Sequence, residues 1–146
     1  MTTTDKSKEL NCTVTLVNEK LHFLGKTDTS DAVSIDYTPP LGDNLGYTSL
    51  ELFLMSLASC VGSAVLVLLR KKGKAIRGFD INATGIRQEQ HPTCFSTITF
   101  NMALRSPDVN DEEFGRVIGL ADEKLCPVYA MIKGNVEVII NRSITI

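Results

Sequence analysis

The sequence predicts an α+β fold in a single domain over residues 1–146, with antiparallel sheets wrapped around a long central helix. Three observations lead to this class. Residues 52–69 form an apolar run without a charged side chain, short β-branched segments lie on both sides of it, and a second helical pattern follows. A chain of 146 residues has the length of one domain. The order βββ-α-ββ-α-β is typical of the α+β class.

Short segments with the alternating, β-branched pattern of strands make up most of the remaining chain. They lie at residues 12–17, 21–24, 33–37, 79–86, 95–104 and 135–140. The stretch TPPLGDNLG forms a turn-rich linker loop at residues 38–46, before the central helix. Residues 1–10 are polar and are predicted to be a flexible tail. They lack the apolar core of a signal peptide, so we expect a cytoplasmic protein.

The central helix is predicted to run from about residue 48 to about residue 72. Thr48 is placed as its N-cap and Glu51 as the residue that bonds back to that cap. Gly73 fits the position just beyond the helix end. The apolar run falls short of the ~20 residues of a membrane span and starts with a cap typical of soluble proteins, so no membrane is expected.

A helix that is apolar on every side has to be buried on every side. A chain of this size can hardly surround such a helix with its own sheets. We therefore expect a second copy of the chain to supply part of the cover, which predicts a homodimer.

A second helix is predicted to begin at residues 108–110 and to end around Cys126 and Pro127. Proline favours the first position of a helix, so residues 128–132 can form a further short helix with Cys126 as its N-cap. The free backbone amides at that position would favour a thiolate on Cys126.

The charges and cysteines exclude several classes of protein. A net charge of −2 offers no general attraction to nucleic acid, and the basic cluster at residues 70–77 is explained as helix C-terminal charge. Cys12, Cys60, Cys94 and Cys126 are not spaced as zinc ligands, so no metal or cofactor is expected. Taken alone, each of these cysteines is more often a small buried apolar residue than a catalyst.

Two of the cysteines lie in sequence motifs that resemble those of a known protein family. The helix TSLELFLMSLASC ends at Cys60, and the stretch ADEKLCPV with Cys126 follows 66 residues later. Together they resemble the OsmC/Ohr family of osmotically inducible and organic hydroperoxide resistance proteins, and in particular its divergent YhfA-like group. The resemblance covers nearly the whole chain. It implies an OsmC-like fold and an intertwined homodimer with the two long helices packed at its centre.

The resemblance also implies an activity. Cys60 would attack an organic, fatty-acid-like hydroperoxide and become a sulfenic acid, and Cys126 would convert that acid to a disulfide. A dithiol reductant would then restore both thiols, so the protein would serve in oxidative-stress defence. The alternative is a non-catalytic homodimer of the same fold that binds a small apolar, lipid-like ligand.

Two departures from the family pattern favour that alternative. The peroxidase branches carry an arginine in the N-terminal strands, whereas this chain has none before Arg70. They also carry a glutamate where Leu50 stands, one place before Glu51. Glu51 lies about 13 Å along the helix from Cys60, so its catalytic role would require the partner's site, and its capping role already explains it. The sequence leaves Lys20, Lys26, Arg87 and Arg105 as candidate substitutes for the arginine.

Overall fold

The computed structural model describes residues 5–146, and the chain divides into two compact units, residues 1–52 and residues 53–146. Each unit is described by itself. Residues 1–4 of the predicted tail lie outside the described part of the chain. The description as one domain over residues 1–146 stays a prediction.

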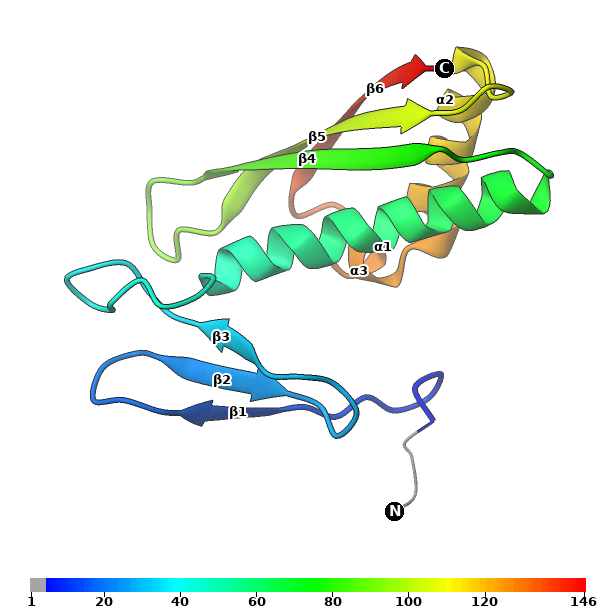
Figure 1. The fold of residues 1–146 in the computed structure, drawn as a ribbon. Coiled ribbons are helices and arrows are strands. Elements are labelled where there is room, and N and C mark those ends of the chain that lie inside the picture. The colour runs from blue at the N-terminus through cyan, green and yellow to red at the C-terminus, as the bar shows by residue number, and fades with distance from the viewer. Residues whose placement is uncertain (1–4) are drawn as a thin grey trace. The chain divides into compact units, whose positions relative to one another are not determined.

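The first unit is a small antiparallel sheet with strand order β1-β2-β3 (Figure 1). Its strands are β1 (Thr13–Leu16), β2 (Phe23–Lys26) and β3 (Val33–Ile35). The strand β2 begins two residues later than the sequence predicts. The side chain of Asn18 explains the delay, because it accepts hydrogen bonds from the backbone N–H groups of Lys20 and His22 and so forms a turn there.

A hydrogen-bonded loop over residues 36–47, called the Asp36 loop below, follows β3. Asp36 is buried and accepts from the backbone N–H groups of Tyr37, Asp43 and Leu45 at 2.7–3.1 Å. Burial acts to raise the pKa of this carboxyl, but the three N–H donors outweigh it, and the pKa is lowered. The predicted linker at residues 38–46 is therefore a defined loop without helix or strand.

Two consecutive side-chain hydrogen bonds also hold the Asp36 loop to the sheet. The hydroxyl of Ser34 donates to the carbonyl of Leu45 at 2.7 Å, and His22 Nε2 lies 2.7 Å from the Ser34 oxygen. Because the hydroxyl proton goes to the carbonyl, His22 is the donor to Ser34. A Cβ on Gly46 would lie 2.1 Å from the Ser34 carbonyl oxygen, so the close approach of the loop to β3 requires glycine.

The central helix α1 (Ser49–Lys71) has the predicted bounds to within one residue. The capping box is confirmed: the N–H of Thr48 donates to Glu51 Oε1 at 2.8 Å, and the N–H of Glu51 donates to Thr48 Oγ1 at 3.2 Å. Gly73 follows the helix with a φ of 75°, a conformation that favours glycine.

In the second unit, β4 (Gly78–Arg87), β5 (Phe95–Arg105) and β6 (Glu137–Thr145) form a sheet in that order. The prediction of purely antiparallel sheets is wrong here, because β6 pairs with β5 in parallel over nine residue pairs. The reason is the helical connection between the two strands, which crosses over the sheet and brings the chain back to the same edge. Figure 1 shows this crossover behind β4 and α1.

The crossover contains α2 (Asp111–Leu120), a π-helical turn η1 (Ala121–Leu125) and α3 (Pro127–Ile132). Asn110 caps α2 by accepting the N–H of Glu113 at 2.8 Å. The sequence predicts one helix that ends around Cys126 and Pro127, but residues 121–125 of it are instead the π turn. The short helix after Pro127, with Cys126 as its N-cap, is confirmed.

The core of this unit lies between α1, the sheet and α2. One face of α1 is fully buried, and so are the inward side chains of β5 and α2; these residues are Leu57, Val61, Val65, Leu69, Ile98, Phe100, Phe114 and Val117. A Cβ on Gly62 would lie 2.7 Å from Ile81 Cδ1, so the glycine permits close packing of α1 on β4. The second unit therefore buries only one side of the apolar helix.

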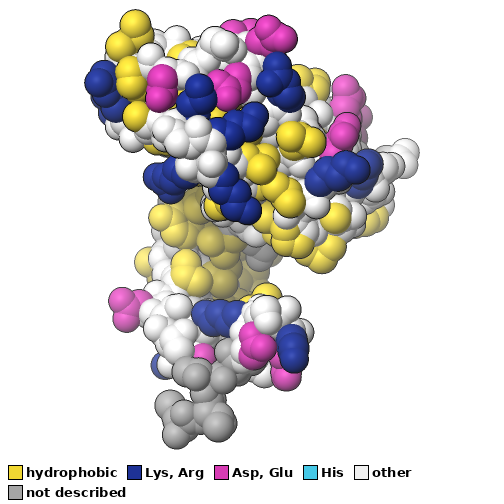
Figure 2. All heavy atoms as spheres, turned by 90° about the vertical axis from the view of Figure 1, so that its right-hand side faces the viewer, with side chains coloured by type: hydrophobic (Ala, Val, Ile, Leu, Met, Phe, Trp, Pro, Cys, Tyr) yellow, Lys and Arg dark blue, Asp and Glu magenta, His cyan; other side chains and the backbone are white. Residues whose placement is uncertain are grey.

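The opposite face of α1 is exposed over Met55, Ser59, Ser63 and Val67. By length and composition α1 is the one helix among residues 5–146 that could cross a membrane, and it is the central helix of this fold. Figure 2, which looks onto the side where α1 ends, shows lysine and arginine side chains gathered there. Arg70 and Lys71 lie in that last turn, as the helix dipole favours.

Candidate active site

Cys60 lies in the middle of α1, and its side chain is half-buried. The helix interior offers no free backbone N–H to a side chain, because each amide there is bonded within the helix. Cys60 therefore depends on groups from other elements for any change in its reactivity.

Cys126 lies at the junction of η1 and α3. Its N–H bonds to the carbonyl of Ala121 at 3.0 Å, which closes the π turn, and its sulfur accepts the N–H of Tyr129 at 3.3 Å. Pro127 at the first position of α3 fixes the direction of the chain there. The thiol is only 3% exposed.

The structure brings these two cysteines together although 66 residues separate them in sequence. Burial, followed by a hydrogen-bonding interaction with the Cys60 thiol, raises the pKa of Cys126 from 9.0 to about 11. The amides of Tyr129 and Val128 act in the opposite direction. The expectation that the helix start favours a thiolate on Cys126 is therefore wrong, because burial and the neighbouring thiol outweigh the amides. Both sulfurs are free thiols.

A hollow of about 430 Å³ opens beside Cys60, and we call it the Cys60 hollow. Its wall comes from the exposed side of α1, from η1 and from the start of α3. Besides Cys60, it is lined by Ser59, Ser63, Ala64, Val67, Leu125 and Pro127. None of these residues is charged. The hollow therefore suits an apolar, uncharged molecule.

Four of the candidate activating groups are engaged in their own surroundings, and the fifth, Lys26, lines a different hollow. Glu51 is held in the capping box, and the Thr48 N–H and hydroxyl lower its pKa. Lys20 forms an ion pair with Asp43 at 2.7 Å. The guanidinium of Arg87 bonds to Thr93, and that of Arg105 bonds to the Arg77 carbonyl. The catalytic assignment of Glu51 stays a prediction.

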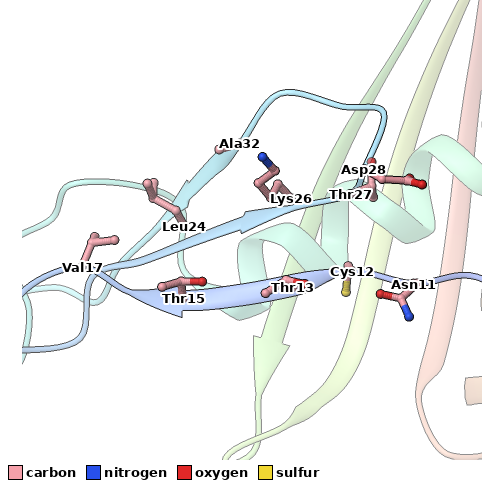
Figure 3. A pocket seen from close by; sticks show the side chains of 10 residues that line it. All are labelled: Asn11, Cys12, Thr13, Thr15, Val17, Leu24, Lys26, Thr27, Asp28 and Ala32. Atoms are coloured by element: carbon pink, nitrogen blue, oxygen red, sulfur yellow. The ribbon is translucent and has the colours of Figure 1, made fainter. Parts of the chain in front are cut away.

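A second hollow, of about 530 Å³, lies on the first unit. Figure 3 shows it along β1 and β2, where Cys12, Thr13, Thr15 and Lys26 contribute to its lining. Cys12 and Cys94 are both exposed and unpaired. Within residues 5–146, no three histidine, cysteine or acidic side chains gather in a way that could hold a metal ion.

Sequence reasoning missed Ser63 and Leu125 as neighbours of Cys60. The place of Ser63 next to Cys60 could have been predicted from the sequence, because residues three apart on a helix share a face. The place of Leu125 in the hollow wall could not be predicted, because it depends on the π turn.

A cysteine-bearing central helix on a mixed sheet, with a second cysteine at the end of a helical crossover, defines an OsmC-like protein. The family model for OsmC-like protein matches residues 42–141. The chain belongs to this family. It is 26% identical to Protein YhfA of Escherichia coli strain K12. The aligned 120 residues cover 82% of this chain and 87% of YhfA.

Solved structures share the fold. A hypothetical protein from Aquifex aeolicus VF5 has a TM-score of 0.80 at 27% identity, over 92% of this chain and 95% of that protein. The organic hydroperoxide resistance protein OhrB of Bacillus subtilis has a TM-score of 0.65 at 19% identity, over 92% and 98% of the two chains. The predicted OsmC-like fold is thus confirmed.

Proposed function

We propose that this protein is a thiol peroxidase that reduces organic, fatty-acid-like hydroperoxides in the cytoplasm, as part of oxidative-stress defence. The observation that carries the proposal is the interaction of the Cys60 and Cys126 thiols beside an apolar hollow. Membership of a family that includes organic hydroperoxide resistance proteins supports the same chemistry.

The proposed reaction has three balanced steps. The Cys60 thiolate attacks the outer oxygen of the hydroperoxide, the O–O bond breaks, and with one proton from water the products are Cys60 sulfenic acid and an alcohol. The Cys126 thiol then attacks the sulfenic sulfur, which forms the Cys60–Cys126 disulfide and releases water. A dithiol reductant exchanges with that disulfide, becomes oxidised, and restores both thiols.

The proposed working form is a homodimer. Met55 and Val67 are 45% and 49% exposed on the outer face of α1, and small side chains lie between them. Exposed apolar side chains on a long helix favour packing against another apolar surface. A second copy on this face would turn the open Cys60 hollow into an enclosed crevice, which favours apolar substrates over hydrogen peroxide.

A second candidate function is binding of a small lipid-like ligand without catalysis. Two observations favour it: burial and the neighbouring thiol raise the pKa of Cys126 to about 11, and no residue that lines the Cys60 hollow carries a charge. The first feature keeps Cys126 protonated at neutral pH, and the second means that the lining offers no cation to an anionic intermediate. They are compatible with an apolar crevice that only holds a molecule.

Stopped-flow kinetics with cumene hydroperoxide and hydrogen peroxide separates the two functions. A peroxidase reacts far faster with the organic substrate than a free thiol does, and mass spectrometry finds a Cys60–Cys126 disulfide. Cys60→Ser abolishes the reaction, while Cys126→Ser still forms the sulfenic acid but no intramolecular disulfide. Cys94→Ser, which removes an exposed cysteine, is the matched control and reacts like the wild type. A wild-type rate equal to that of a free thiol rejects the peroxidase.

A further inference from the structure

The Cys60 hollow contains few groups that can donate a hydrogen bond to a substrate. Apart from the Cys60 thiol, its lining offers only two hydroxyls, those of Ser59 and Ser63, and the remaining side chains are apolar. An alkyl hydroperoxide releases an alkoxide when its O–O bond breaks. Because that oxygen gains negative charge, a nearby donor lowers the barrier.

The two hydroxyls differ in what they already bond. The Ser59 hydroxyl donates to the carbonyl of Ser56 at 3.1 Å, so its single proton is engaged within the helix. Among the hydrogen bonds of residues 5–146, none involves the hydroxyl of Ser63. Ser63 therefore has a donor free for a molecule in the hollow.

The position of Ser63 fits the reaction geometry. It lies three residues after Cys60 on α1, and such pairs are neighbours on a helix face, with Cβ atoms about 5–6 Å apart. Both side chains line the same hollow. A hydroperoxide whose outer oxygen meets the Cys60 sulfur can thus present its inner oxygen to the Ser63 hydroxyl.

We propose that Ser63 is a catalytic residue whose hydroxyl donates a hydrogen bond to the departing oxygen when Cys60 attacks an alkyl hydroperoxide. The inference rests on the peroxidase function proposed above. The sulfur gains the outer oxygen, the O–O electron pair goes to the inner oxygen, and water supplies the proton that completes the alcohol. The hydroxyl of Ser63 is itself unchanged after the step.

The test compares two kinds of oxidant. The leaving group of tert-butyl hydroperoxide is an alkoxide and needs the donor, whereas that of peroxybenzoic acid is a stable carboxylate and does not. Removing one such donor from an enzyme costs about 10²–10³ in rate. We expect Ser63→Ala to slow sulfenic acid formation by that factor with tert-butyl hydroperoxide and to leave the peroxybenzoic acid reaction within about twofold.

Two further variants make the outcome specific. Ser56→Ala removes a hydroxyl from the same helix, four residues before Cys60 and outside the hollow lining, and is expected to react like the wild type with both oxidants. Ser63→Thr keeps a hydroxyl and should recover most of the lost rate. An equal loss with both oxidants, or no loss with tert-butyl hydroperoxide, overturns the role of Ser63. A slow wild type instead overturns the peroxidase itself, so the two failures are distinguishable.

Discussion

The Asp36 loop and the Cys126 site shift the pKa of a buried acidic group in opposite directions. Asp36 and Cys126 are equally buried, at 3% exposure each. Three backbone N–H groups surround the carboxylate and its pKa is lowered, whereas one N–H lies 3.3 Å from the sulfur and the pKa of Cys126 rises to about 11. The donors around each group, and for Cys126 the neighbouring thiol, decide in which direction its pKa moves at equal burial.

This difference separates a structural polar site from a reactive one. The carboxylate of Asp36 accepts three hydrogen bonds that hold its loop in place. The thiol of Cys126 is protonated at neutral pH and interacts with the Cys60 thiol.

The largest expected effect comes from removing the carboxylate. Asp36→Ala leaves three backbone N–H groups without their acceptor, and each orphaned donor costs about 1–3 kcal/mol, partly offset by water. We expect a loss of about 3 kcal/mol in unfolding free energy, measured by urea denaturation and circular dichroism. The control Asp43→Ala removes an exposed ion pair with Lys20 and should cost less than about 1 kcal/mol.

A pH titration sharpens the same prediction. Because the pKa of Asp36 is lower in the folded state, its contribution is fully present above the usual value of 3.8 and is lost as the pH falls through the folded pKa. The stability difference between wild type and Asp36→Ala should therefore shrink only in acid. Equal costs for Asp36→Ala and Asp43→Ala at neutral pH contradict the structural role.

The next effect concerns the thiolate population of Cys126. A pKa of about 11 in place of 9.0 reduces the thiolate at neutral pH about a hundredfold. The Cβ chemical shift of Cys126, followed by NMR, should titrate well above the pH at which the same residue titrates in the urea-unfolded protein. In Cys60→Ala, which removes the hydrogen-bonding partner, the midpoint should fall but stay above the unfolded value, because burial is the larger cause. A midpoint below the unfolded value argues against this account.

The smallest effect concerns the start of α1. Thr48→Ala removes the cap and should destabilise the protein by about 1 kcal/mol in urea denaturation, with Ser49→Ala as a nearly neutral control. Glu51→Gln keeps an acceptor for the Thr48 N–H and should cost less. If Glu51 only caps the helix, the rate of Cys60 oxidation is unchanged in Glu51→Gln. A large rate loss in that variant supports the catalytic assignment instead.

Local signals made much of this structure predictable. The bounds of α1 followed from Thr48, Glu51 and Gly73, and the short helix after Cys126 followed from Pro127. The parallel pairing of β5 with β6 was missed, although the long helical connection between them was a usable sign. The family motif supplied the pairing of Cys60 with Cys126, which no local pattern could give, because it depends on the packing of α1 against the crossover.

The rest depended on tertiary structure. Nothing around Asp36 in the sequence marks it as buried, since three donors arrive from a loop folded back on itself. The π turn also lacks a local signature, because ADEKL has ordinary helix formers throughout.

That π turn has a geometric consequence. Its hydrogen bonds span five residues where those of α2 span four, so the helical ladder is dislocated immediately before Cys126. This dislocation gives Cys126 a position that a continuous α-helical ladder through residue 126 would not give it. One extra residue in the turn thus sets where the second thiol lies, and π turns inside helical segments are frequent at functional sites.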